Sequence, residues 1–285
     1  MTRAHRSPML ATLLTLAFLA VLQAGAQTVR VPSRFVPGDA AIAAAAKYQS
    51  APFLSQGGSN VLAVWADNRA NSTGGYDGET SWDIYGTRLD GAGNPLEATP
   101  FAVAAGKASQ KNPRAAWNGM SWLVVYESLD VSGTGSYYQD SLEAVRVAAD
   151  GHVLDATPIK LYNMTPVGAT WAVSSDGSQW VVVNQGTSST GDLVAARISS
   201  AGVLLDPGPR SIVPGTYYLR GGIHLAYAGG VFLLAYEESM TGYDPTTAIR
   251  FNSSLTPIDP APYGLLGSTI SRLASNGTNF YAVWN

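Results

Sequence analysis

The chain of 285 residues contains no cysteine. This absence excludes a disulfide framework, thiolate metal ligands and cysteine nucleophiles together, so the fold must be stabilised by buried apolar surface. Charged residues make up only 13% of the sequence. The four lysines are scattered and no basic cluster forms along the chain, which argues against nucleic acid as a partner.

Catalytic signatures are also missing. Beyond the N-terminal segment the histidines are His152 and His224, and the sequence has no Gly-x-Ser-x-Gly, no His-Glu-x-x-His and no phosphate-cradling glycine loop. We interpret both histidines as structural. The sequence therefore predicts no catalytic residue and favours a protein that is not an enzyme.

The N-terminal segment has the features of an export signal. Arg3 and Arg6 precede an apolar stretch over residues 9–22, and Ala-Gly-Ala at residues 24–26 forms a small-x-small cleavage site. A membrane anchor is the alternative, but an apolar run of about 14 residues is short for a bilayer span of about 20. We predict a signal peptide over residues 1–26 and a protein secreted from a bacterium or held at its surface, without a membrane span in the mature chain. Its removal takes away two arginines and no acid, which changes the net charge from -3 to -5.

A degenerate repeat occupies the rest of the chain. Its clearest mark is an apolar run after a small turn, which recurs five times and ends at Trp65, Tyr126, Asn184, Tyr236 and Trp284. Between successive runs stands a strand-like piece with an arginine, followed by a turn and a Leu-Asp-Pro-like tail. Those arginines are Arg88, Arg146, Arg197 and Arg250.

Each repeat contains four extended pieces, which we call A to D. Piece B is the apolar run, and continuous apolarity is typical of a strand covered on both faces. Four antiparallel strands in a repeating unit of about fifty residues predict an all-β fold, a β-propeller of four-stranded blades. A β-sandwich would explain the strands but not their repeated order.

The repeat also predicts the domain organisation. After the signal peptide we expect a linker or first strand over residues 27–40 and propeller repeats over 41–285. The expected blade units are 51–104, 112–161, 168–213, 221–265 and a partial unit, 269–285. A partial D-type strand comes first and the last repeat stops after piece B, which predicts either a five-bladed ring with one incomplete blade or a piece of a longer chain.

Several phrases resemble a known repeat. "NPRAAWNG", "NG..W.VVY" and "DIYGTRLD..GNPLEATPFAVA" are similar to a repeat abundant in long secreted proteins of bacteria, including myxobacteria, that is regarded as propeller-forming. The likeness is strong in the first unit, moderate in the second and weak in the third. It implies a propeller fold and export, and it implies no catalytic residues.

Residues that recur at one position in every unit are better explained as structural than as parts of a single active site. The four repeated arginines occupy one position in every unit, so we interpret them as structural, each paired with an acid or a carbonyl beside the preceding B strand. The expected acids are Asp67, Glu127 and Glu238. Arg114 and Arg272 both stand four residues before an Asn-Gly turn, and we interpret them as architectural too.

The connection between pieces B and C does not repeat, because it is longer in the first two units. Long loops on a rigid all-β scaffold are frequent binding sites. Aromatic rings beside carboxylates suit a sugar, and oxygen-rich loops also suit calcium, although neither loop has a strict calcium-loop spacing. The candidate ligand-binding residues are Tyr76, Asp77, Glu79, Trp82, Asp83, Tyr137, Tyr138 and Asp140.

Together these features predict a secreted, non-catalytic propeller that serves as a binding or scaffold module for a glycan or an extracellular protein. No cofactor is expected, apart from calcium in the loops. The alternative is a polysaccharide-active enzyme, a glycosidase or sialidase-like propeller, which needs only two carboxylates. The segment 174–180, "SSDGSQW", resembles the Asp box of propeller sialidases but is one residue short.

Overall fold

The computed structural model describes residues 48–69, 82–106, 108–130, 139–163, 170–186, 191–215, 219–238, 246–265 and 270–284. All of them belong to one compact unit within residues 36–285. The described residues form strands and turns and contain no helix. In these ranges, accordingly, no helix has the length and apolarity needed to cross a membrane.

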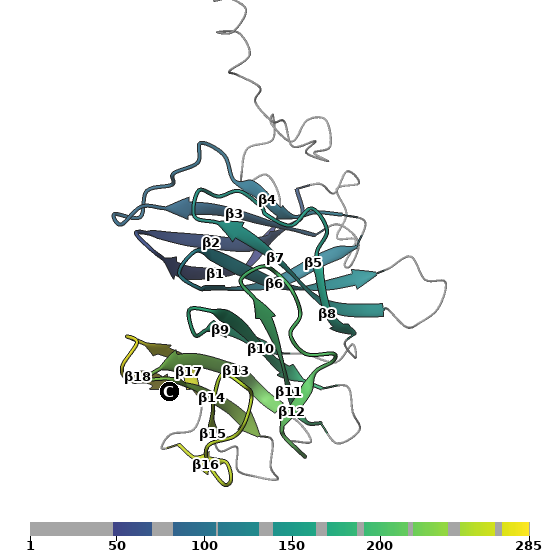
Figure 1. The fold of residues 1–285 in the computed structure, drawn as a ribbon. Helices are drawn as coiled ribbons and strands as arrows, with labels where there is room; N and C mark the ends of the chain where they lie inside the picture. Colours follow the sequence, from purple (N-terminus) through teal and green to yellow (C-terminus); the bar gives the residue numbers. More distant parts are fainter. Residues whose placement is uncertain are drawn as a thin grey trace, which may run out of the picture. The chain divides into compact units, whose positions relative to one another are not determined.

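The strands form five antiparallel sheets (Figure 1). The first contains β1 (Gln49–Gly57), β2 (Asn60–Asp67), β3 (Asp83–Leu89) and β4 (Phe101–Ala104). The second contains β5 (Ser109–Trp117), β6 (Ser121–Asp130), β7 (Gln139–Ala148) and β8 (Ile159–Asn163). The third contains β9 (Trp171–Ser175), β10 (Gln179–Gln185), β11 (Leu193–Ser199) and β12 (Arg210–Val213). The fourth contains β13 (Leu219–Ala228), β14 (Val231–Glu238), β15 (Thr246–Phe251) and β16 (Tyr263–Gly264), and the fifth contains β17 (Ile270–Ser275) and β18 (Phe280–Trp284).

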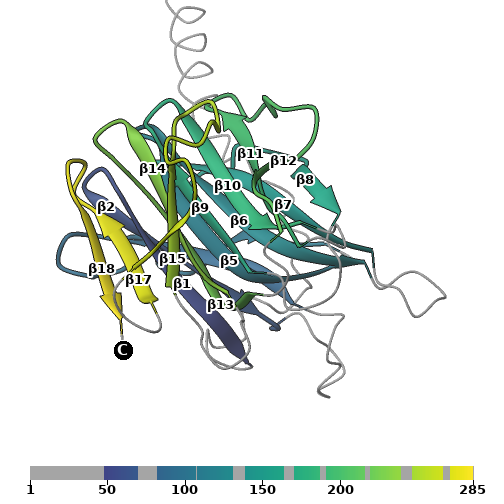
Figure 2. The same cartoon turned by 90° about the horizontal axis from the view of Figure 1, so that it is seen from below.

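Four sheets have four strands each, and in each the strands lie in chain order. The first strands of successive sheets contact one another in turn, β1 with β5, β5 with β9, β9 with β13 and β13 with β17. These five strands are therefore the inner strands of sheets that follow one another around a centre (Figure 2). This arrangement is a β-propeller of four-stranded blades, and the fold predicted from the sequence is confirmed.

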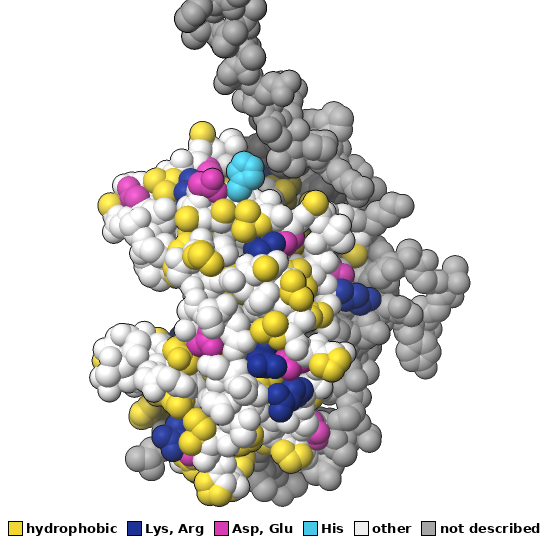
Figure 3. Space-filling view, in the orientation of Figure 1, with side chains coloured by type: hydrophobic (Ala, Val, Ile, Leu, Met, Phe, Trp, Pro, Cys, Tyr) yellow, Lys and Arg dark blue, Asp and Glu magenta, His cyan; other side chains and the backbone are white. Residues whose placement is uncertain are grey.

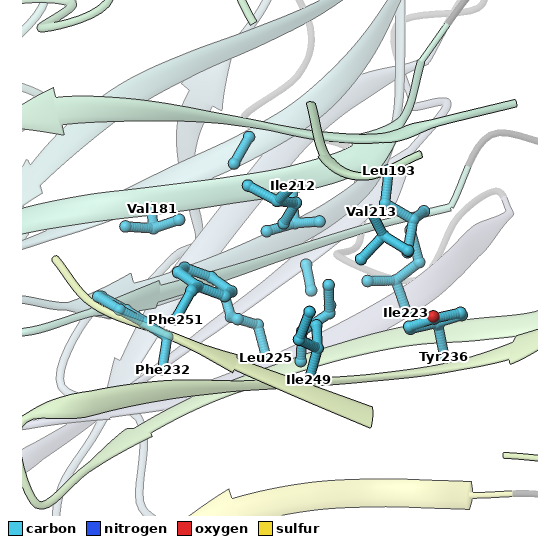
Figure 4. Packing of buried hydrophobic residues seen from close by; sticks show 14 of the residues in the cluster. Val181, Leu193, Ile212, Val213, Ile223, Leu225, Phe232, Tyr236, Ile249 and Phe251 are labelled. Atoms are coloured by element: carbon cyan, nitrogen blue, oxygen red, sulfur yellow. The ribbon is translucent and has the colours of Figure 1, made fainter. Parts of the chain in front are cut away.

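The second strand of each complete blade supplies the core. In β6, alternate residues point to opposite sides: Trp122 and Val124 pack against the first sheet, whereas Leu123 and Val125 pack against the third. All four side chains are fully buried. The same packing joins the third and fourth sheets through β10 and β14 (Figure 4). Continuous apolarity in this strand is required because both of its faces are covered.

Indole hydrogen bonds fix the spacing between neighbouring blades. Trp122 Nε1 donates to the Ser55 carbonyl of the first sheet over 3.1 Å, and Trp180 Nε1 donates to the Ala116 carbonyl of the second sheet over 2.8 Å. Both tryptophans are fully buried, so each polar N–H needs this partner. The equivalent residue of the fourth sheet is Phe232, whose ring stacks on Phe251 with 5.3 Å between centroids.

The sheets at the two ends of the series are covered less completely. In β2, Val61, Ala63 and Trp65 are only half-buried, although Leu62 and Val64 between them are fully buried. The strand β18 is mostly exposed. The first and fifth sheets therefore each have one face that the described strands cover only in part, whereas both faces of β6 and β10 are buried.

The repeated arginines are structural, as predicted, but the predicted acid partners are wrong. Each arginine pairs with the acid nine residues later, in the tail after piece C, at 2.6–2.8 Å. The four pairs are Arg88–Glu97, Arg146–Asp155, Arg197–Asp206 and Arg250–Asp259. The acid lies beside its arginine because the chain turns back along piece C after a tight turn. Figure 3 shows basic and acidic side chains next to one another on one face of the molecule.

Two of these arginines also tie one blade to the next. Arg88 Nη1 donates to the Ala149 carbonyl over 2.7 Å, and Arg146 Nη1 donates to the Ser200 carbonyl over 2.9 Å. Gly202, at a φ of +81°, allows this approach, since a Cβ there would lie 2.8 Å from Arg146 Nε.

We predict that Gly57→Ala destabilises the protein. An added Cβ would lie 2.4 Å from the indole ring of Trp122 and would push apart the first two sheets. Overpacking of this kind costs roughly 1–3 kcal/mol of unfolding free energy. Urea unfolding of the variant checks this, with Gly91→Ala as the control because no atom lies within 4 Å of a Cβ at that position. Equal stability of the two variants would contradict the packing described.

We also predict that Asp155→Asn lowers the melting temperature more than Asp259→Asn does. Asp155 holds Arg146, which is 17% exposed and reaches the next blade, whereas Arg250, the partner of Asp259, is 46% exposed. Exposed ion pairs contribute little to stability. Thermal melting of both variants is the measurement, and equal shifts would show that the bond to the next blade adds nothing.

Candidate active site at the centre of the propeller

One register position of the inner strand points to the centre in all five sheets. In each sheet, this residue pairs with the next-to-last residue of the apolar run in the second strand. The five residues are Phe53, Arg114, Ala172, His224 and Arg272. All five line a single cavity of about 460 Å³. The centre of the propeller is therefore a pocket whose lining differs from blade to blade.

Backbone bulges precede this position in four of the five inner strands. The register shifts between Ser50 and Phe53 in β1 and between Lys111 and Arg114 in β5, and comparable shifts occur in β13 and β17. Asn112, within the bulge of β5, has a φ of +53°, a conformation that asparagine tolerates better than most residues. Bulges re-aim the side chains that follow them, which explains why these residues face the cavity.

The cavity lies near the N-terminal ends of the inner strands. At the same end β2 finishes and β3 begins, since Asp67 pairs with both Gln49 and Asp83. The ends of the B-to-C connections and the central pocket thus lie at the same end of the blades. Phe53 and Trp171 give this pocket aromatic surface, and Arg114, Arg272, His224 and Glu127 give it groups that carry or accept protons.

Glu127 supplies the carboxylate of the lining. Its Oε2 accepts a hydrogen bond of 3.0 Å from Asn112 Nδ2, so the bulge of β5 also orients the acid at the end of β6. Asn112 and Glu127 both border the cavity. A carboxylate held in this way can donate or accept a proton at an oxygen of a bound molecule.

Arg114 is the most buried cation of the lining. Its guanidinium carbon lies 5.4 Å from the centroid of Phe53, and its Nη1 donates to the Pro113 carbonyl over 3.1 Å. Burial, and then the positive charge of Arg272, lower the pKa of Arg114 below its usual value. The second of these causes shows that the two positive charges lie close enough to repel each other.

His224 lies beside these cations. Burial, together with the charges of Arg272 and Arg114, lowers the pKa of its imidazole from 6.5 to about 4, although a hydrogen bond with the Ile270 backbone acts in the opposite direction. The imidazole packs over Gly222, where a Cβ would lie 2.9 Å from His224 Nε2. His224 is therefore neutral at pH 7, and its surroundings disfavour the uptake of a proton.

The residues predicted to bind a ligand are only partly within the described ranges. Tyr76, Asp77, Glu79, Tyr137 and Tyr138 lie outside them, and so do the loop segments expected to bind calcium. Asp140 is part of β7, where its backbone pairs with Leu129.

Trp82 and Asp83 are both described, and each side chain is 8% exposed. Trp82 packs in the core between the first two sheets, and Lys111 Nζ lies 5.8 Å from its ring centroid. Asp83 Oδ1 accepts a hydrogen bond of 3.2 Å from the Gly106 amide. Both residues therefore make internal contacts, and their predicted contact with a ligand stays a prediction.

The central position is not among the residues that we predict to bind a ligand. Our interpretation of Arg114 and Arg272 as architectural, because they share a place before an Asn-Gly turn, and of His224 as structural does not identify their place in the pocket. The signal was present: aligning the inner strands places phenylalanine, arginine, alanine, histidine and arginine at one position of an otherwise regular repeat. A position that varies where its neighbours repeat is a candidate for chemistry.

No family model matches the chain, and no curated protein matches it. Solved structures do. A puromycin-hydrolysing peptidase from Mycobacterium tuberculosis matches with 15% identity and a TM-score of 0.50 over 82% of this chain and 34% of the peptidase. A GH43_1 enzyme from Xanthomonas citri matches with 13% identity and a TM-score of 0.49 over 82% of this chain and 81% of the enzyme. The catalytic domain of a GH62 α-L-arabinofuranosidase from Coprinopsis cinerea has 12% identity and a TM-score of 0.44 over 81% and 78%.

These comparisons correct two predictions. The similar structures are enzymes and several are glycoside hydrolases, which contradicts the predicted non-catalytic scaffold and the prediction that the chain is not an enzyme. Likeness at such low identity shows the fold alone, so any activity of this chain must be argued from its own residues.

We predict that His224 makes the protein less stable in mild acid. The unfolded chain takes up a proton at this residue near pH 6.5, but the folded protein does so only near pH 4. The contribution of neutral His224 is present above about pH 6.5 and is lost as the pH falls towards 4. Unfolding free energies of the wild type and His224→Gln, measured between these values, should show a steeper fall for the wild type. Parallel curves, or an NMR titration midpoint of His224 at its usual value, would contradict this.

Proposed function

We propose that this protein is a polysaccharide-active enzyme that cleaves glycosidic bonds at the central pocket. The observation that carries the proposal is the carboxylate of Glu127, held by Asn112 at 3.0 Å inside a cavity of about 460 Å³. A cavity of this size accommodates a sugar unit or two, since ligand pockets range from roughly 300 to 1,000 Å³. With the signal peptide predicted over residues 1–26, the enzyme would act outside the cytoplasm.

The lining also supports the binding of a sugar ring. Phe53 and Trp171 border the cavity and give apolar surface to the faces of a sugar. Trp171 is only 4% exposed, so its ring is held rigidly in the inner strand β9. Hydroxyl groups of the sugar find partners in Glu127, Asn112 and Thr170, which border the same cavity.

Two groups of the lining can take part in the reaction. Glycosidic cleavage commonly needs one group that protonates the leaving oxygen and another that activates the attacking water. We assign the proton transfer to the leaving oxygen to Glu127. His224 is neutral at pH 7 because its pKa is lowered to about 4, so it is a weak base, and we assign it the role of holding the attacking water by a hydrogen bond. Gly222 positions it, because a larger residue there would displace its imidazole.

We predict that Glu127→Gln lowers the rate of glycan cleavage by roughly 10²–10⁴-fold, the usual contribution of a general acid or base, and leaves glycan binding largely intact. The measurement is the release of new reducing ends from a panel of plant and microbial polysaccharides. Asp150→Asn is the matched control, because Asp150 is an exposed acid in the turn between β7 and β8 and does not border the cavity.

Two results would contradict the proposed function. One is the absence of new reducing ends with the wild type across the panel, and the other is cleavage by Glu127→Gln at the rate of the wild type. Asn112→Ala adds a further readout. It removes the hydrogen bond to Glu127 and should lower the rate less than Glu127→Gln does, because the acid itself remains.

A further inference from the structure

Arg114 differs from the repeated arginines because no carboxylate among the described residues forms an ion pair with it. Each of Arg88, Arg146, Arg197 and Arg250 forms an ion pair of 2.6–2.8 Å with a carboxylate of its own blade. Among the described residues no carboxylate forms such a pair with Arg114, whose contacts are the Pro113 carbonyl and the ring of Phe53. Within the described ranges, this partly buried arginine therefore lacks the direct carboxylate partner that each repeated arginine has.

A second cation faces the same space. Arg272 occupies the position of Arg114 in the fifth sheet, and its charge acts on both Arg114 and His224. The lining therefore carries two guanidinium groups and, in the part of the chain that is described, one carboxylate. Like charges that lie close together, one of them partly buried, repel each other unless an opposite charge joins them.

Buried polar atoms at the start of β9 favour the same kind of ligand. Trp171 Nε1 and Thr170 Oγ1 are both buried and have no hydrogen-bond partner among the described residues, and both residues border the cavity. By contrast, the buried indoles of Trp122 in β6 and Trp180 in β10 each donate to a carbonyl. A buried N–H without a partner is costly, so a ligand oxygen in the cavity would stabilise it.

We infer that the central pocket accepts an acidic sugar, whose carboxylate or sulfate group lies against the guanidinium groups of Arg114 and Arg272. The planar fork of arginine matches the oxygens of such groups and can bind two of them at once. The sugar ring then lies against Phe53 and Trp171, with Glu127 near its hydroxyl or bridging oxygens. This inference rests on the proposed function, because it names the class of glycan that the same pocket would take.

The test is a binding measurement by titration calorimetry with the full chain carrying Glu127→Gln, so that cleavage does not consume the ligand. The probes are an oligogalacturonate, a neutral galactose oligosaccharide of equal length and a sulfated galactose oligosaccharide. We expect at least one acidic probe to bind roughly tenfold or more tightly than the neutral one, the effect of a charge-assisted hydrogen bond. The acidic probe that binds more tightly identifies the group, carboxylate or sulfate.

Variants then assign the binding to the two arginines. Adding Arg114→Gln should weaken the acidic probe roughly tenfold or more and leave the neutral probe unchanged, and Arg114→Lys should weaken it less because the charge is kept. Lys160→Gln is the matched control, since it removes one positive charge from an exposed position of β8. Should Arg114→Gln fail to fold, as judged by its melting curve, Arg272→Gln provides the same comparison at an exposed residue.

The outcomes separate this inference from the proposed function. The inference is overturned if the neutral and acidic probes bind equally well. It is also overturned if Arg114→Gln and Arg272→Gln leave the binding of the acidic probe unchanged. Both conclusions would hold even if the wild type cleaves neutral glycans. Tight binding of an acidic probe that depends on Arg114, with no cleavage by the wild type of that probe or of any glycan in the panel, supports the inference and overturns the proposed function.

Discussion

Face-to-face packing of successive sheets through their apolar second strand is the constraint on which the rest of this structure depends. In the second, third and fourth sheets, the residues of the apolar run are buried in two clusters, alternately on one side and the other. A series of sheets around a common centre covers both faces of these strands in this way. The indole bonds of Trp122 and Trp180 then fix how closely neighbouring sheets approach.

This packing also determines where chemistry can occur. Because one register position recurs in every inner strand, five side chains from distant parts of the sequence meet at one cavity. The bulges before that position, in four of the five strands, aim the side chains inward. Phe53, Arg114 and His224 can therefore differ in chemistry while the blades around them stay alike, so the cavity can change its ligand without a change of fold.

The sequence predicted the fold well and the site poorly, for a physical reason. Strands covered on two faces must be apolar throughout, which leaves a repeated pattern that can be read directly. The partner of each repeated arginine was missed because the pairing is set by a turn that brings Asp155 back beside Arg146, nine residues away, and not by the neighbouring strand. The central site was missed because its residues share no type. Only the register of the sheets, together with the bulges, shows that Arg114, His224 and Arg272 face one another.

The most direct test of the account is a crystal structure of the Glu127→Gln protein with an acidic oligosaccharide. The account predicts a sugar in the central cavity, with its charged group within hydrogen-bond distance of Arg114 and Arg272 and its ring against Trp171. A sugar bound only at the outer loops, with solvent alone between the two arginines, would contradict it.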